Sequence, residues 1–256
     1  MKKKAALVCS GGGALGAAQL GVLKALEERY EFDFYAGVSA GSILVCLHSS
    51  GFDADESWEI VQKMNVFDVA FDFSLQKSGM LKGKKMLKLF DKIFSETKLE
   101  NLSHPTFVGT TDFQTGENIL LHSGKISDAL RASCSVPVLF EPYFHPEKKR
   151  WLVDGGLTEN LPLSIALKKY KGDTIIAIDT NYMDTNANFK DAKNGGLQKL
   201  LNRTIKIFIN NQHSFPHPDK RIRRILLPIT EFTPSDALKL KAIYKQGLEI
   251  GKNTHL

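Results

Sequence analysis

The chain alternates short apolar runs with stretches in which apolar residues recur at helical spacing. This alternation is typical of βαβ units, in which a largely parallel sheet is buried between helices. Strands are predicted at residues 5–10, 34–38, 106–111, 118–122, 151–153, 174–179 and 222–229. Helices are predicted at residues 17–29, 42–50, 80–94, 125–132 and 235–251. The pattern therefore predicts an α/β fold around a mainly parallel sheet.

The length of 256 residues suits one compact unit, so we expect a single domain over residues 1–256. No stretch reaches the roughly 18 uninterrupted apolar residues of a membrane-spanning helix. The basic start is followed by an apolar run that ends at Ser10, which is too short for the core of a signal peptide. We therefore expect a soluble, cytoplasmic protein, with a mobile polar loop at residues 183–196.

The cysteines and the net charge indicate the redox environment and the kind of surface that the chain would bind. Cys9, Cys46 and Cys134 are odd in number and far apart, which predicts reduced thiols that behave as small buried apolar groups. The formal net charge of +6 favours anionic surfaces such as phospholipid headgroups or nucleic acid. Composition alone does not choose between these two partners.

A glycine-rich motif, GGGALG from Gly11 to Gly16, lies directly between a predicted strand and a predicted helix. Glycines leave backbone N–H groups uncovered, and the N-terminus of the following helix adds positive potential, so this segment predicts an anion site. Such a site suits the pyrophosphate of a dinucleotide or the oxyanion formed during acyl transfer. A plain tight turn has the same composition.

A second motif, GVSAG from Gly37 to Gly41, also joins a strand to a helix. The pattern GxSxG is typical of a nucleophile elbow, in which small neighbours permit a strained turn that presents the serine hydroxyl. Ser39 is the candidate nucleophile, and a simple helix N-cap is the alternative. Both glycine motifs fall at the carboxyl ends of strands, where open α/β sheets place their sites.

A third motif supplies a candidate base. Asp154, Gly155 and Gly156 follow the predicted strand at residues 151–153. A carboxylate can accept the proton of a serine nucleophile, and the two glycines allow another part of the chain to approach closely. A surface turn is the alternative for this triplet taken in isolation.

Together these motifs resemble the patatin-like phospholipase family. The likeness runs through SGGGALGAAQLGVLKAL, AGVSAGS, ALRASCSVPVLFEPY and DGGLTENLP. It implies a three-layer α/β/α sandwich and a catalytic dyad of Ser39 as nucleophile and Asp154 as general base, without histidine, metal or cofactor. The amides of Gly12 and Gly13 would form the oxyanion hole. The implied supporting glycines are Gly11, Gly16, Gly37, Gly41, Gly155 and Gly156.

The resemblance also implies a partner. The substrate would be a lipid or another ester, with phospholipids as the first guess, and no nucleic acid partner is expected. One position departs from the family, because many members carry Arg or Lys where this chain has Leu15. We expect Leu15→Arg to raise turnover modestly or to leave it unchanged.

Three other functions fit parts of the sequence. A dinucleotide-binding oxidoreductase would use the first motif, but its second strand should end in an acidic residue and here it ends in GVSAGS. A Ser-His-Asp triad could draw on His213, His217 or His255, with Asp179 as a further acid, although no motif supports these residues. A non-catalytic lipid-binding protein would keep the fold without the chemistry. No metal-binding motif is found.

The segment at residues 80–94 predicts an amphipathic helix. Its lysines, Lys84, Lys85, Lys88 and Lys92, lie away from its apolar side. A core helix with a solvated lysine face is the ordinary interpretation. The segment is also compatible with a transient contact with an anionic membrane surface.

Overall fold

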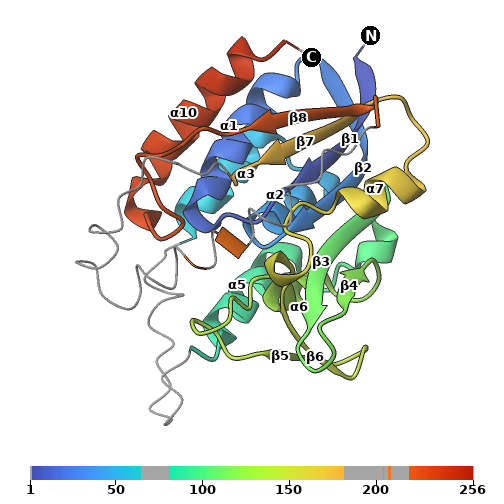
Figure 1. The fold of residues 1–256 in the computed structure, drawn as a ribbon. Coiled ribbons are helices and arrows are strands. Elements are labelled where there is room, and N and C mark those ends of the chain that lie inside the picture. The colour runs from blue at the N-terminus through green and yellow to red at the C-terminus, as the bar shows by residue number, and fades with distance from the viewer. Residues whose placement is uncertain (1, 65–80, 182–203, 205–206, 209–218, 256) are drawn as a thin grey trace.

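A mostly parallel sheet forms the middle layer of the computed structural model (Figure 1). The structure describes all residues except 1, 65–80, 182–203, 205–206, 209–218 and 256. Within the described residues the strand order is β5-β6-β3-β2-β1-β7-β8, with β4 beside β3. The strands are β1 (Lys3–Cys9), β2 (Tyr30–Val38), β3 (Thr106–Asp112), β4 (Asn118–Leu121), β5 (Tyr143–His145), β6 (Arg150–Asp154), β7 (Ile175–Asp179) and β8 (Ile222–Leu226).

Five of these strands are parallel, and the other three form an antiparallel margin. Strands β1, β2, β3, β7 and β8 run in one direction, so their carboxyl ends meet at one edge of the sheet. Strands β4 and β6 run antiparallel to β3, and β5 runs antiparallel to β6. The mainly parallel sheet predicted from the sequence is confirmed.

Helices cover both faces of the sheet. The α-helices are α1 (Gly16–Leu26), α2 (Ala40–Ser49), α3 (Ala54–Lys63), α5 (Lys84–Phe94), α6 (Ile126–Ser133), α7 (Leu163–Lys169) and α10 (Leu240–Asn253). Short 3-10 turns are η1 (Gly13–Leu15), η2 (Leu99–Asn101), η3 (Gly155–Leu157) and η4 (Ala237–Lys239). None of the helices in the described part of the chain is long and apolar enough to cross a membrane.

The central strand β1 shows why the fold has three layers. Leu7 points into a core shared with α1, α3 and α10, whereas Val8 points into a second core shared with α7. Both side chains are fully buried. Because alternate side chains along a strand face opposite ways, a continuous apolar run places the strand between two apolar layers. The predicted α/β/α sandwich is confirmed.

Three elements were not predicted, namely α3, β5 and α7. The first begins with a capping box, in which Asp53 accepts from the N–H of Glu56 and Glu56 accepts from the N–H of Asp53. The other two are short, at three and seven residues, so their periodicity carries little information. Strand β2 begins at Tyr30, four residues before the predicted start. The loop predicted at residues 183–196 lies outside the described residues.

Helix α5 is the amphipathic segment noted in the sequence. Met86, Phe90 and Phe94 are buried in a core cluster with α6 and β3. The four lysines of this segment, Lys84, Lys85, Lys88 and Lys92, are exposed. The interpretation as a core helix with a solvated lysine face is therefore confirmed. A membrane contact through those lysines stays a prediction.

Leu15 is buried in the core beside α1, with 3% of its surface exposed. A guanidinium at this position would lose its hydration and would overfill a packed site. The burial argues against the expectation that Leu15→Arg leaves turnover unchanged or raises it.

We therefore expect Leu15→Arg to lower the free energy of unfolding by roughly 2 to 4 kcal/mol, as is typical of a charge forced into a core. Thermal or urea denaturation measures this loss. The matched control is Leu238→Arg in η4, where the leucine is 80% exposed and the change should leave stability within about 0.5 kcal/mol. Equal stabilities of the two variants would contradict the assignment of Leu15 to the core.

Candidate active site

The sheet register brings Ser39 and Asp154 to the same level of the fold. Val38 pairs with Gly109 across β2 and β3, so the next residue, Ser39, reaches the level of Thr110. Thr110 pairs with Asp154 across β3 and β6. Strand β3 therefore lies between the two strands that carry the candidate nucleophile and the candidate base.

Ser39 sits in a strained turn between β2 and α2. Its φ of 52° and ψ of −123° are a conformation that residues other than glycine seldom adopt. The turn also needs its flanking glycines. A Cβ on Gly37 would lie 2.6 Å from the carbonyl oxygen of Gly41, and a Cβ on Gly41 would lie 2.5 Å from that of Cys9. The elbow expected from GxSxG is present.

Several hydrogen bonds hold the strained backbone of Ser39 in place. Its N–H donates to Ser133 Oγ over 2.8 Å, and that hydroxyl donates to the carbonyl of Gly109 over 2.7 Å. Its carbonyl accepts from the N–H of Ser42 at 2.9 Å and from Ser42 Oγ at 2.6 Å. The serine is consequently fixed from both sides, with 8% of its surface exposed.

The carboxylate of Asp154 lies close enough to Ser39 for the two side chains to interact. The N–H of Gly156 donates to Asp154 Oδ1 over 2.8 Å. Burial raises the pKa of Asp154 from its ordinary value of 3.8 to about 6, against the lowering effect of the Gly156 N–H and the Ser39 side chain. The group is therefore a stronger base than a solvated aspartate and is still mostly ionised at pH 7.

Cys134 lies beside the same pair, because its thiol interacts with both Ser39 and Asp154. Burial is the largest effect on its pKa and raises it, and the negative charge of Asp154 raises it further. The residue therefore stays a neutral thiol and is a poor nucleophile. All three cysteines are buried and free, as the sequence predicted.

The glycine loop passes directly beside Ser39. A Cβ on Gly11 would lie 3.2 Å from Ser39 Cβ, and the N–H of Gly11 donates to the carbonyl of Asn160 over 3.1 Å. The N–H groups of Gly12 and Gly13 have no hydrogen-bond partner among the described residues. Gly13 has a φ of +55° and lies against Pro234. The loop thus offers two unused donors near the serine.

The other supporting glycines lie at close approaches between elements. A Cβ on Gly16 would lie 2.8 Å from Ala40 Cβ, where α1 starts beside α2. A Cβ on Gly155 would lie 2.6 Å from the backbone of Gly109 in β3. The first contact brings the first motif against the elbow, and the second brings the third motif against β3.

Sequence reasoning did not single out three polar residues near the site, namely Ser133, Asn160 and Thr180. Ser133 binds the elbow, and the other two bind the carbonyl of Gly11. Ser133 and Asn160 lie inside segments that carry the family resemblance, and Thr180 directly follows the buried strand β7. A polar residue placed next to a motif or at the carboxyl end of a strand was the available signal.

The residues of the alternative sites lie elsewhere or outside the description. His213 and His217 fall outside the described residues, and His255 is exposed after the end of α10. Asp179 is buried at the end of β7 and pairs with Arg224 of β8, so it makes a structural contact between two strands. No cluster of three or more His, Cys, Asp or Glu side chains suited to a metal occurs in the described residues.

The described residues thus combine a three-layer α/β fold with a serine elbow, a nearby aspartate and a glycine loop. The patatin-like phospholipase family matches residues 7–167 of this chain. The chain therefore belongs to the patatin-like phospholipase family.

Individual relatives support this membership. An uncharacterized NTE family protein of Mycobacterium tuberculosis is 33% identical over 171 residues, which cover 66% of this chain and 29% of that protein. Patatin-like phospholipase domain-containing protein 6 of Mus musculus is 30% identical over 185 residues, which cover 70% of this chain and 14% of that protein. The chain thus spans less than a third of the length of these two relatives.

The solved structures show the same architecture. The crystal structure of VipD from Legionella pneumophila matches with a TM-score of 0.57 and 15% sequence identity. The match covers 98% of this chain and 66% of VipD. At this identity the likeness shows the fold alone.

The raised pKa of Asp154 predicts an effect on stability. A folded pKa of about 6, against an ordinary 3.8, gives stability that is fully present below pH 3.8 and lost as the pH rises through 6. The loss at neutral pH is on the order of 3 kcal/mol at most. Because Asn removes the charge and can still accept from Gly156, we expect Asp154→Asn to be more stable than wild type at pH 7.5. Melting temperatures measured from pH 4 to 8 should show this gap closing as the pH falls.

Asp112 in β3 provides a control of opposite sign. The N–H groups of Thr115 and Gln114 and the Arg150 side chain hold its pKa below the ordinary range. Asp112→Asn should therefore be less stable than wild type at pH 7.5, and that deficit should shrink as the pH falls. A loss of stability in Asp154→Asn that stays constant with pH would contradict the burial argument.

Proposed function

We propose that this chain hydrolyses fatty-acyl esters of lipids, with Ser39 as nucleophile, Asp154 as general base and the amides of Gly12 and Gly13 as oxyanion donors. The observation that carries the proposal is the position of Ser39, in a strained elbow, beside a buried Asp154 whose pKa is about 6. A base with a pKa near the working pH combines the ionised form with a useful affinity for a proton.

In the first half of the reaction Ser39 Oγ attacks the ester carbonyl, while its proton passes to Asp154. The carbonyl oxygen becomes an anion and accepts from the N–H groups of Gly12 and Gly13. The tetrahedral intermediate then collapses, the bond to the alcohol breaks, and Asp154 returns the proton to the leaving alkoxide. The products of this half are an alcohol and an acyl ester on Ser39.

In the second half a water molecule takes the place of the alcohol. Asp154 accepts a proton from the water as its oxygen attacks the acyl carbonyl, and the same two amides hold the new oxyanion. Collapse of this intermediate returns the proton to Ser39 Oγ and releases the fatty acid. Neither half needs a histidine, because a single carboxylate both takes and returns the proton.

The substrate class follows from the family, whose described activity is that of a phospholipase. Phospholipids are the first choice, and lysophospholipids and simple esters share the same carbonyl chemistry. We further propose that residues 1–256 act as one domain and that the exposed lysine face of α5 allows a transient contact with an anionic membrane surface. The dinucleotide alternative is less favoured, because Ser39 directly follows Val38 at the end of β2.

The nucleophile is tested with Ser39→Ala. We expect this change to abolish hydrolysis of a chromogenic short-chain ester and to abolish labelling by a fluorophosphonate, because loss of a serine nucleophile can cost on the order of a millionfold in kcat. The matched control is Ser49→Ala, which removes another buried serine hydroxyl from the helix that follows the elbow. The control should keep both activity and labelling.

Two outcomes would overturn this assignment. Labelling of a different serine in a folded Ser39→Ala protein would place the nucleophile elsewhere. Wild-type protein that binds lipid vesicles without turning over any ester would favour the non-catalytic lipid-binding function.

The base is tested by the pH dependence of kcat/KM. Because burial raises the pKa of Asp154 to about 6, we expect activity to fall as the pH drops through 6, where the carboxylate takes up a proton. A histidine base with an ordinary pKa of about 6.5 would give a similar acid limb, so the pH of the limb alone does not distinguish the two bases. The temperature dependence of the limb distinguishes them, because the pKa of a carboxyl group changes little on warming whereas the pKa of an imidazole falls. An acid limb that moves downward on warming would contradict the aspartate base.

A further inference from the structure

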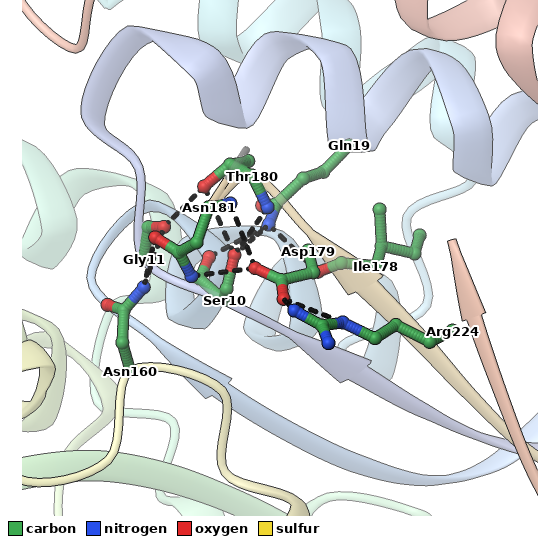
Figure 2. Close-up of polar contacts among 9 residues, drawn as sticks. All are labelled: Ser10, Gly11, Gln19, Asn160, Ile178, Asp179, Thr180, Asn181 and Arg224. Carbon is green, nitrogen blue, oxygen red and sulfur yellow. Dashed lines mark hydrogen bonds and ion pairs between the residues drawn. The ribbon is translucent and has the colours of Figure 1, made fainter. Parts of the chain in front are cut away.

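Both polar groups of the Gly11 peptide backbone are held by residues from distant parts of the chain (Figure 2). Its N–H donates to the carbonyl of Asn160 over 3.1 Å. Its carbonyl accepts from Thr180 Oγ1 over 2.6 Å and from Asn160 Nδ2 over 3.3 Å. The residues that directly follow, Gly12 and Gly13, are the ones whose N–H groups have no partner in the described structure. Gly11 is therefore the fixed point from which the two donors extend.

Thr180 is itself fixed at the carboxyl end of β7. Its N–H donates to Ser10 Oγ over 2.9 Å, and the two hydroxyls lie 3.1 Å apart. Gln19 of α1 donates to the carbonyl of Ser10 over 2.8 Å and to its hydroxyl over 3.2 Å. All three side chains are buried. Thr180 Oγ1 accordingly has little freedom to turn away from Gly11.

Asn160 is supported from the other side by Asn181. Its Nδ2 donates to Asn181 Oδ1 over 3.1 Å. Asn181 in turn donates to Asp179 Oδ1 from its backbone N–H and from its Nδ2, over 2.9 and 2.6 Å. This contact orients the Asn181 amide, so that its oxygen faces Asn160.

An ion pair anchors this chain of contacts to β8. Arg224 donates to Asp179 Oδ2 from Nε over 3.0 Å, and its Nη2 contacts the same oxygen. Asp179 is fully buried, and a buried carboxylate needs such a partner. Figure 2 shows the side chains of Asn160, Asn181, Asp179 and Arg224 in sequence from the glycine loop toward β8.

We propose that Thr180 and Asn160 are positioning residues that, by holding Gly11, orient the N–H groups of Gly12 and Gly13 toward the oxyanion; this inference rests on the proposed function. Oxyanion donors accelerate a reaction because they are already oriented when the charge develops. A glycine loop without such anchors samples many conformations, and in most of them the two N–H groups do not point toward the oxyanion. Misplacement by about 1 Å can cost on the order of 100-fold in rate.

The position of Asn160 in the chain links the donors to the base. It lies on the same short segment as Asp154, and a Cβ on Gly156 between them would lie 2.9 Å from Asn160 Oδ1 and 3.1 Å from Asp154 Oδ1. One compact turn therefore holds the catalytic carboxylate and the anchor of the glycine loop. The relative position of base and donors is set by this turn.

Thr180→Val tests the inference, because it removes the hydroxyl and keeps the shape. We expect kcat to fall about 10- to 100-fold while KM stays within about twofold, since the donors act on the transition state more than on the bound substrate. Thr180→Ser restores the hydroxyl and should recover most of the loss. The matched control is Thr106→Val at the opposite end of the sheet, where a buried threonine hydroxyl likewise donates to a carbonyl, that of His104, over 3.0 Å. It should keep the wild-type kcat.

The pH profile gives a readout that a general loss of structure would not give. Thr180→Val should leave the burial of Asp154 and its hydrogen bond from Gly156 unchanged, so the acid limb of kcat/KM should stay near pH 6 while the plateau drops. Asn160→Ala is the second variant, because it removes the Nδ2 donor and leaves the backbone carbonyl that binds the Gly11 N–H. It should show the same lowered plateau and the same limb.

Hydrogen–deuterium exchange of the segment at residues 10–16 measures the positioning without any activity. Exchange should be faster in Thr180→Val and Asn160→Ala than in wild type and in Thr106→Val. An active wild type in which Thr180→Val and Asn160→Ala keep kcat within twofold would overturn the inference, whatever the exchange shows. If the wild-type protein shows neither turnover nor labelling, the proposed function is wrong. If, in addition, Thr180→Val and Asn160→Ala exchange at the same rate as wild type, the positioning role is wrong too.

Discussion

The pairing of β3 with β2 on one side and with β6 on the other is the constraint on which the site depends. Ser39 directly follows β2 and Asp154 ends β6, and these two strands do not pair with each other; β3 lies between them and sets the level of both residues. A shift of one residue in either pairing would turn the carboxylate to the opposite face of the sheet. Strand β6 runs antiparallel to β3, and the Asp154 end of β6 lies at the level of Thr110, beside the elbow.

The site also contains features that work against stability. Ser39 has a strained backbone, and Asp154 is ionised at neutral pH in a place where burial favours the neutral form. The surroundings compensate with Ser133 Oγ, which accepts from the Ser39 N–H, and with the Gly156 N–H, which donates to Asp154; these bonds hold the geometry without removing the strain or the raised pKa. A carboxylate that is costly to ionise is also one that accepts a proton readily. The same burial therefore lowers stability and raises the affinity of Asp154 for a proton.

Much of the fold and the centre of the site could be predicted from the sequence, because their signals are local. The apolar run of β1 and the small residues around Ser39 each impose their structure within a few positions. Helix α3 had a readable signal in its capping box and was missed, whereas β5 is too short to show any periodicity. The burial of Leu15 could not be read locally, since it depends on how α1 packs against α10. The likeness to family members that carry Arg or Lys at this position even suggested that a charged side chain would be accepted there.

The contacts of Asn160 and Thr180 explain why the site extends beyond its motifs. Each hydrogen bond to Gly11 joins residues about 150 or more positions apart, so no spacing rule connects them. The physical need was nevertheless readable: a glycine loop is too flexible to hold a pair of donors, and some residues outside the loop must restrain it. Parallel strands end at one edge, and the candidates for that task are therefore the polar residues that follow neighbouring strands. Thr180 meets this condition directly after β7, whereas Asn160 meets it through its closeness to Asp154, so Asp154 and the glycine loop share one anchor.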